Sequence, residues 1–268
     1  MIIKYINLNI WMGELFKSTL QFLKEQKADI VVLQEVMHHE NAEKLSLKHQ
    51  TKVILERELG LKYSEYFPLV LDKRFNPPAL FGNLILSRFP IENSKKVFFD
   101  RPFREWDNSL PNEEFTRGLL VCEINVNNTL LTVGNIHGIW GKHGADTDRR
   151  LNMIDIVLKE LKGQERVILS GDFNLNERVY PEINGKADLS KPQRTKSVAL
   201  LEEKFVNIFK DERITSFNPN YKDFVTTGYA HAVVDMVFVT PNIKILSHIQ
   251  PDVDVSDHMP QIVELEIN

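Results

Sequence analysis

The feature that most constrains this sequence is a set of short apolar runs, spread over the whole chain, that each end in polar side chains. One such run is Val167-Ile168-Leu169, which predicts a buried strand and is followed directly by Ser170-Gly171-Asp172-Phe173-Asn174. On an extended backbone the Asp172 carboxylate and the Asn174 amide project from the same side. Gly171 permits a sharp turn and the close approach of a ligand. The pentapeptide alone is equally typical of a strand-to-turn junction, so the other strand ends decide its interpretation.

Strand-like and helix-like segments alternate along the chain, with hairpin signals among them. The predicted strands are residues 2–10, 29–33, 81–91, 119–124, 130–133, 167–169, 233–239 and 262–267. The predicted helices are residues 14–26, 39–59, a helix capped by Asp146 or Thr147, and 197–209. This mixture indicates an α/β fold with mixed sheets. No linker or repeat divides the chain, so residues 1–268 are predicted to form a single domain.

Composition limits the classes of protein to consider. The length of 268 residues suits one large domain. A net charge of −4 gives no overall basic footprint for nucleic acid, although a local basic groove can lie on an acidic protein. Cys122 is the only cysteine, which excludes an intrachain disulfide and a cysteine zinc site. No leader and no apolar segment of membrane-spanning length is recognisable, so a cytoplasmic protein is favoured and a secreted form stays open.

Polar residues that end or interrupt the predicted strands supply carboxylate, amide and imidazole groups: Asn9, Glu35, His137, Asp172, Asn174, Asp235, Asp257 and His258. Strand ends gather at one rim of an α/β fold, where binding sites form. Oxygen ligands without cysteine suit Mg²⁺ or Mn²⁺, and histidines beside carboxylates suit proton transfer. The alternative for Glu35 is a capping role at the start of the helix predicted to follow it.

Taken in order, the motifs resemble those of the endonuclease/exonuclease/phosphatase superfamily. The matching segments are Asn9, Leu33-Gln34-Glu35, Gly82-Asn83-Leu84-Ile85-Leu86-Ser87, Asn135-Ile136-His137, Gly171-Asp172-Phe173-Asn174, Asp235 and Ser256-Asp257-His258. The resemblance implies a four-layer α/β/β/α sandwich, with two mixed β-sheets packed face to face and helices outside. It also implies a hydrolase of phosphate esters that depends on Mg²⁺ or Mn²⁺ and directs a metal-activated water in line at phosphorus.

The resemblance further implies metal and water-binding roles. Glu35 would be the main metal ligand, assisted by Asn9 and Asp257. Asp172 and Asn174 would position and activate the attacking water.

The histidines have implied roles as well. His258, steered by Asp235, would act as a general base or orient the phosphate, and His137 would donate a hydrogen bond to a non-bridging oxygen. Abasic-site enzymes usually carry a tyrosine in the role of His137, so the chain is nearer the deoxyribonuclease, sphingomyelinase and phosphatase branches. With a single cysteine, this chain differs from the extracellular deoxyribonucleases, which have disulfides. The basic substrate motifs of inositol phosphatases are sparse in this sequence.

Three further residues are candidates for substrate binding. Arg117 suits a phosphate, Asn83 suits the same group, and Trp140 lies in a loop where it can stack on a ring. The alternatives are a solvated arginine, a turn amide and a local packing anchor.

A metal-dependent phosphodiesterase, with nuclease activity as the leading branch, is the function this sequence favours. A phosphatase or lipid phosphodiesterase is the runner-up, and a non-catalytic binding protein on the same fold is the remote alternative. The expected partner is a phosphate-ester substrate, nucleic acid among the candidates, and a monomer is favoured.

Overall fold

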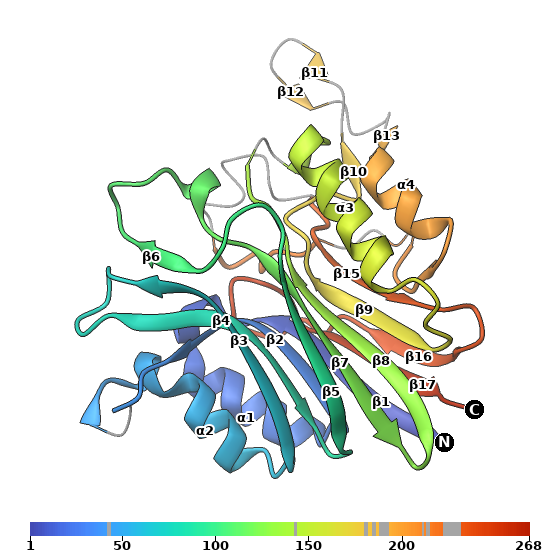
Figure 1. Ribbon diagram of the computed structural model, residues 1–268, viewed down its shortest axis with the longest axis horizontal. Coiled ribbons are helices and arrows are strands. Elements are labelled where there is room, and N and C mark those ends of the chain that lie inside the picture. The colour runs from blue at the N-terminus through green and yellow to red at the C-terminus, as the bar shows by residue number, and fades with distance from the viewer. Residues whose placement is uncertain are drawn as a thin grey trace.

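Two β-sheets packed face to face form the centre of the molecule. The computed structural model describes residues 1–41, 44–141, 144–179, 182–183, 186–187, 193–210, 212, 215–221 and 232–268. Figure 1 shows helices α1 (Phe16–Gln26) and α2 (Thr51–Glu58) on the outside of one sheet, and α3 (Asp148–Glu160) and α4 (Lys196–Glu202) on the outside of the other. The predicted four-layer α/β/β/α sandwich is confirmed.

The first sheet has seven strands and holds the N-terminal third of the chain. Its order is β16 (Lys244–Ile249), β17 (Gln261–Glu266), β1 (Ile2–Asn9), β2 (Ile30–His38), β4 (Ala79–Ser87), β3 (Tyr63–Asp72) and β6 (Arg104–Trp106). The β1–β2 and β3–β6 pairs are parallel and the other pairs are antiparallel, so the sheet is mixed as predicted.

The second sheet has six strands. Its order is β14 (Val206–Asn207), β15 (Asp235–Val239), β9 (Val167–Asp172), β8 (Thr129–His137), β7 (Gly118–Val126) and β5 (Ile91–Phe98). Only β8 and β9 pair in parallel. Asn127 and Asn128, both at positive φ, form the hairpin turn between β7 and β8.

Short elements complete the described part of the chain. They are the 3₁₀ turns η1 (Trp11–Gly13), η3 (Leu47–Gln50) and η4 (Asn112–Glu114), and the two-residue strands β10 (Arg178–Val179), β11 (Glu182–Ile183), β12 (Lys186–Ala187) and β13 (Gln193–Arg194). Thr147 caps α3 by accepting a hydrogen bond from the Arg150 backbone N–H at 3.3 Å, as one of the two predicted caps.

Alternating side chains divide the core into layers. In β1, Ile3 and Tyr5 face the second sheet, while Ile6 and Leu8 pack under α1 and α2. On the outer face of the second sheet, Ile154 of α3 packs in the same buried cluster as Leu169 of β9. Both faces of each sheet are therefore buried, which explains the nearly continuous apolar runs in the central strands.

The predicted helix over residues 39–59 is wrong in its first half. Strand β2 continues to His38, and the helix begins only at Thr51. Thr51 donates to the Met37 carbonyl at 2.9 Å and accepts from the Met37 N–H at 2.8 Å, which ties the helix start to the strand. Glu35 therefore lies within a strand and caps no helix.

Among the longer strands, β3, β5 and β16 were not predicted, and each lacks a clear alternating pattern. Strand β5 is mostly exposed, as is β16 at the sheet edge, and β3 is interrupted by Pro68 where its pairing register with β4 shifts. Residues 99–116, which lie outside the predicted strands and helices, contain β6 and η4. These segments depend on neighbours distant in sequence rather than on local periodicity.

The two ends of the described chain lie together. The Met1 amino group donates to the Ile267 carbonyl at 2.5 Å, and the Ile267 N–H donates to the Met1 carbonyl at 2.7 Å. Figure 1 shows the N and C ends near each other, and in the pairing of β1 with β17 Ile2 lies opposite Glu266. Among the described helices, none has the length and apolar character needed to cross a membrane.

We expect the thiol of Cys122 to resist labelling in the folded protein. It is fully buried between the sheets, and burial raises the pKa of the thiol to about 12, so both access and thiolate formation are suppressed. A thiol-reactive chromophore should label one group per chain in denaturant and almost none without it. Stoichiometric labelling of the native protein within minutes would contradict the packing of β7.

Candidate active site

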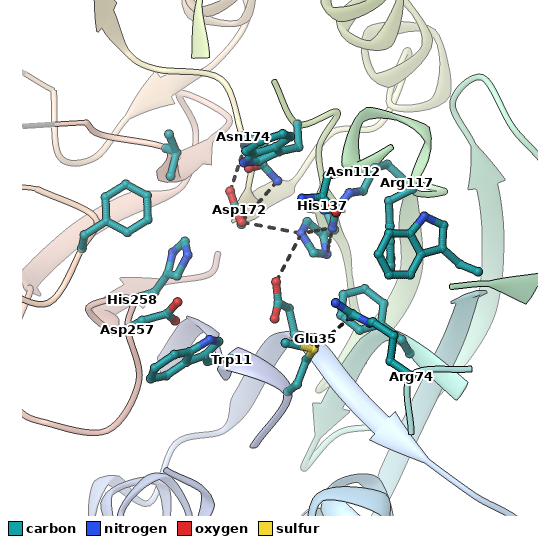
Figure 2. A pocket seen from close by; sticks show the side chains of 17 residues that line it. Trp11, Glu35, Arg74, Asn112, Arg117, His137, Asp172, Asn174, Asp257 and His258 are labelled. Carbon is teal, nitrogen blue, oxygen red and sulfur yellow. Dashed lines mark hydrogen bonds and ion pairs between the residues drawn. The ribbon is translucent and has the colours of Figure 1, made fainter. Parts of the chain in front are cut away.

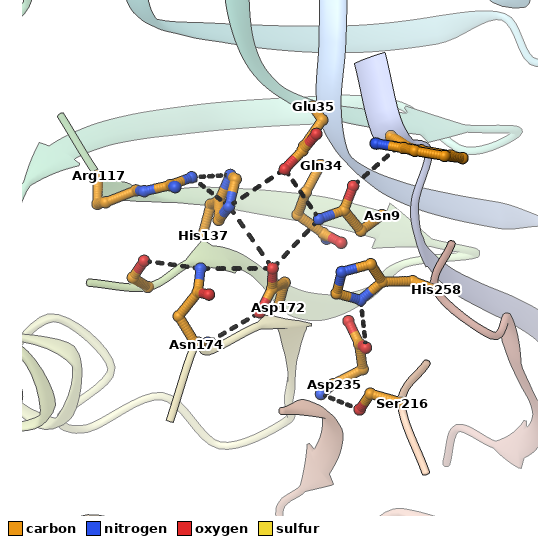
Figure 3. Close-up of polar contacts among 12 residues, drawn as sticks. Asn9, Gln34, Glu35, Arg117, His137, Asp172, Asn174, Ser216, Asp235 and His258 are labelled. Atoms are coloured by element: carbon orange, nitrogen blue, oxygen red, sulfur yellow. Dashed lines mark hydrogen bonds and ion pairs between the residues drawn. The ribbon is translucent and has the colours of Figure 1, made fainter. Parts of the chain in front are cut away.

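Four strands bring polar side chains to one rim of the sandwich. Asn9 ends β1 and Glu35 lies in β2 of the first sheet, while His137 ends β8 and Asp172 ends β9 of the second. The Asn9 amide donates to Glu35 Oε1 at 3.2 Å and to Asp172 Oδ2 at 3.1 Å, so it bridges the two sheets (Figure 3). The predicted gathering of these groups is present in the structure.

A β-bulge directs Glu35 toward this rim. Glu35 has a φ of 60°, and the register between β2 and β4 shifts between Leu33 and Val36. Gln34 points into the space between the sheets, where its amide donates to Asn135 Oδ1 at 2.8 Å. The extra residue of the bulge therefore places an amide in the interior and the next carboxylate in the site.

The turn after β9 orients Asp172. The Asn174 backbone N–H donates to Asp172 Oδ1 at 2.8 Å, and the Asn174 amide donates to the Gly138 carbonyl at 3.1 Å. Gly171 has a φ of 144°, and a Cβ there would lie 2.0 Å from the Ile136 carbonyl oxygen, so only glycine fits.

His258 and Asp235 form a buried pair on the other side of Asp172. The His258 Nδ1 and Asp235 Oδ2 are 2.7 Å apart, which fixes the ring and leaves Nε2 for a ligand. Phe217 packs edge-on against the imidazole with ring centroids 4.8 Å apart. The Ser216 hydroxyl accepts the Asp235 backbone N–H at 2.7 Å and so holds the start of β15.

Arg117 and His137 form a second pair. Arg117 Nη1 lies 2.9 Å from His137 Nδ1 and also contacts Nε2, and because a guanidinium only donates, the ring nitrogen without a proton is the acceptor. Burial, together with the charge of Arg117, holds the pKa of His137 well below its usual value. The Nε2 atom of His137 lies 3.6 Å from Asp172 Oδ2 and 3.9 Å from Glu35 Oε1.

The carboxyl groups destabilise one another's charge. Burial and then the charge of Asp257 raise the pKa of Glu35 to about 7. Burial also raises the pKa of Asp172, to about 6, and that of Asp257. Burial alone lowers the pKa of His258, but Asp235 and Asp257 outweigh it, so the pKa of His258 is well above its usual value. A cation bound near these carboxyl groups would stabilise their ionised forms.

These groups line one pocket of about 410 Å³. Its lining includes the predicted Glu35, Arg117, His137, Trp140, Asp172, Asn174, Asp257 and His258 (Figure 2). The predicted Asn9 and Asp235 do not line it directly but hold lining residues in place.

Asn83 is not brought to the pocket. Its side chain is fully buried, and its amide donates to the Asn135 carbonyl at 3.1 Å, so it joins the two sheets. Central strand β4 presents Asn83 to the interior, and the prediction that it binds substrate finds no support in this position.

Several lining residues were missed from the sequence: Trp11, Met12, Arg74, Phe81, Asn112, Phe115, Phe217 and Val234. Trp11 and Met12 come two and three residues after the motif residue Asn9, and this proximity was the available signal. Trp11 has a φ of 48° and its N–H donates to Asn9 Oδ1 at 3.0 Å. Arg74 and Asn112 come from connecting segments whose place depends on the fold, and no sequence signal marked them.

The donor set suits a hard divalent cation. Within the described ranges no three or more His, Cys, Asp or Glu side chains form a ready-made metal cluster. Mg²⁺ typically takes only one or two carboxylates and keeps several waters, so such a cluster is not needed. Glu35 and Asp257 are the residues that would hold the ion, which would offset the burial and the charge of Asp257 that raise the pKa of Glu35. Asn9, predicted as a ligand, instead directs its amide nitrogen to Glu35 and its oxygen to the Trp11 N–H.

The class of protein follows from comparison with known sequences. Residues 6–258 match the model of the Endonuclease/Exonuclease/phosphatase family, and the chain belongs to this family. The sequence matches no curated protein at a significant level.

Solved structures share the fold at low sequence identity. The chain is similar to an endonuclease/exonuclease/phosphatase from Beutenbergia cavernae DSM 12333, with a TM-score of 0.74 and 17% identity over 99% of this chain and 72% of that one. It is similar to D. rerio TDP2 complexed with single strand DNA product, with a TM-score of 0.66 and 15% identity over 99% of both chains. A mannosyl-6-phosphatase from Bacteroides thetaiotaomicron VPI-5482 gives a TM-score of 0.61 and 14% identity over 99% of this chain and 100% of that one.

Replacing Glu35 by Gln should stabilise the metal-free protein. The raised pKa of Glu35 means that its charge opposes folding above the unfolded-state value of 4.5, and fully so above about 7. In chelator near pH 8, Glu35→Gln should therefore gain about 1 kcal/mol or more and raise Tm by about 2–4 °C. Scanning calorimetry should show the gain shrinking as the pH falls toward 5, where folded Glu35 is protonated. A gain that grows on acidification would contradict this origin.

Proposed function

We propose that this protein hydrolyses phosphate esters with the help of Mg²⁺ or Mn²⁺, and that phosphodiesters, nucleic acids first among them, are its substrates. The observation that carries the proposal is the convergence of Glu35, Asp172 and His258 on one pocket from three distant parts of the chain. A family of nucleases, phosphodiesterases and phosphatases is the context in which this set occurs.

The residues divide the work between holding phosphate and directing water. Asp172 and Asn174 would hold the attacking water at the end of β9, with Asp172 accepting its proton. His258, oriented by Asp235, would exchange a proton or donate to a phosphate oxygen through Nε2. A bound divalent cation would supply Lewis-acid stabilisation of the developing charge.

His137 and Arg117 would stabilise the phosphate from the opposite side. A neutral His137 would donate from the one ring nitrogen that carries a proton, so it needs no charge for this role. Arg117 is buried behind it and adds a permanent positive charge to a pocket that is otherwise rich in carboxylates. Both groups face the pocket before substrate binds, so little reorganisation is required.

The pocket wall favours a substrate with rings as well as phosphate. Trp11, Trp140 and Phe217 line the pocket, Trp140 is exposed, and aromatic rings in a pocket wall suit bases or sugars. The similarity to TDP2 in complex with a DNA product supports nuclease-type substrates. The similarity to a mannosyl-6-phosphatase supports the alternative, a phosphatase that acts on a small headgroup.

Hydrolysis should depend on Glu35 and His258. We expect Glu35→Ala and His258→Ala each to lower the rate by about a hundredfold or more, because each removes a positioned charge or proton donor. Rates with bis(4-nitrophenyl) phosphate and Mg²⁺ or Mn²⁺, and again with chelator, give the measurement. His248→Ala is the matched control, since His248 lies on β16 and does not line the pocket.

If both site variants keep the wild-type rate, the proposed mechanism is wrong. If the wild-type protein binds oligonucleotide but turns over no phosphate ester with either metal, a non-catalytic binding protein is the better description.

Salt dependence should separate polymeric from small substrates. A polyanion releases counterions on binding, so cleavage of single-stranded DNA, RNA or plasmid should fall steeply with added salt while bis(4-nitrophenyl) phosphate is little affected. A parallel screen should include sphingomyelin and sugar phosphates. Faster turnover of a lipid or a monoester than of any polynucleotide would favour the alternative branch.

A further inference from the structure

A cationic and aromatic wall lies across the pocket from the catalytic groups. Figure 2 shows Arg74 and Arg117 on one side of the pocket and Asp257 and His258 on the other. Arg74 belongs to the β3–β4 connection, and the roles proposed above for phosphate and water do not use it.

Arg74 is held rigidly by its neighbours. Its Nε and Nη2 donate to Asp72, at 3.0 Å to Oδ1 and 2.7 Å to Oδ2, and the Asp72 carboxylate is fully buried. The guanidinium carbon lies 4.5 Å from the centroid of the Trp106 ring. Trp106 is opposite Asp72 in the β3–β6 pairing, so the backbone itself sets this stack. The guanidinium is therefore preorganised, although about a third of the side chain is exposed.

The donors on this wall exceed the acceptors that meet them. Among the described residues, the hydrogen bonds of Arg74 use only its backbone N–H, Nε and Nη2, which leaves Nη1 for a ligand. The indole Nε1 of Trp106 and the Nε of Arg117 are buried and have no hydrogen-bond partner in the described part of the chain. Buried donors of this kind are costly unless an acceptor reaches them.

An anionic group fits this wall better than any other ligand. Arg117 faces the carboxylates of Glu35 and Asp172, and its pKa is lowered first by burial and also by the charge of Arg74. A second anion next to Arg74 would relieve the repulsion between the two guanidiniums and accept hydrogen bonds from the unused Nη1 of Arg74. The catalytic groups already provide for the scissile phosphate, so this anion is a different part of the substrate.

We propose that Arg74 is a specificity-determining residue that binds a second phosphate of the substrate, next to the phosphate that is hydrolysed. The inference rests on the proposed function in that it names the preferred substrates of the same pocket. The preferred substrates carry two phosphates on one nucleoside or sugar unit, as a polynucleotide does at every internal nucleotide. The Trp106 ring lies beneath the guanidinium and limits the position of that phosphate to the open edge.

The test compares ligands that differ by one phosphate. Calorimetric titration in chelator measures binding of adenosine 3′,5′-bisphosphate against adenosine 5′-monophosphate, and of fructose 1,6-bisphosphate against fructose 6-phosphate. In the wild-type protein the second phosphate should tighten binding by about tenfold or more in at least one pair, the gain expected of a charge-assisted contact. The pair with the larger gain identifies a nucleotide or a sugar as the source of the phosphate.

The variant must not leave the buried Asp72 without its partner. We therefore use the double variant Asp72→Asn with Arg74→Gln, which removes both charges, leaves the net charge unchanged and keeps an acceptor for the Arg74 backbone N–H. Arg88→Ala is the control, because Arg88 lies outside the pocket and has a largely exposed side chain. The gain from the second phosphate should vanish in the double variant and persist in the control.

An equal gain in the double variant and the wild-type protein, or no gain in the wild-type protein for either pair, would overturn the inference. Turnover of bis(4-nitrophenyl) phosphate, which carries a single phosphate, keeps the two proposals apart. If this turnover occurs without any gain in binding, only the role of Arg74 fails. If the gain occurs without turnover of any ester, the proposed function fails and the phosphate-binding role stands.

Discussion

The arrangement of the whole site depends on a few amide hydrogen bonds that cross the interior between the two sheets. Asn135 of β8 donates to the Leu33 and Leu84 carbonyls of the first sheet at 2.9 and 3.1 Å, and it accepts from Gln34. The Tyr5 and Ser170 hydroxyls meet across the same interior at 2.5 Å. Apolar packing alone is non-directional, whereas these bonds fix how far one sheet slides on the other.

That constraint lies directly beneath the reacting groups. Leu33 and Gln34 precede Glu35 in β2, and Asn135 comes two residues before His137 in β8. A shift of one residue between the sheets would separate Glu35 from the His137 and Asp172 pair, because neighbouring residues in a strand are about 3.3 Å apart. The bulge at Glu35 allows β2 to serve the interior and the pocket at once, since it directs Gln34 into the interior and Glu35 into the pocket. The same hydrogen bonds therefore stabilise the interior and set the geometry of the site.

The α/β fold class and most of the polar residues that meet at the pocket could be predicted from local signals and from the order of the motifs. Strand ends such as Asn9 and the run at Asp172 show both the apolar segment and the polar group that follows it. The bulge at Glu35 could not be predicted, since a positive φ at a residue other than glycine depends on the pairing with β4. Asn83 was misplaced for a related reason, because the sequence does not say which face of a central strand meets the other sheet. Arg74 gains its role only when β6 brings Trp106 beneath it.

The pairing of the two ends of the chain has a practical consequence for handling the protein. Strand β1 runs from Ile2 toward the pocket and ends there at Asn9, so the two ends of that strand are roughly 23 Å apart. Ile267 lies beside Met1, at the same far end of the sheet. An affinity tag, a dye or a solid support attached at either end would therefore face away from the mouth of the pocket, and a long polymer could still thread past the immobilised molecule.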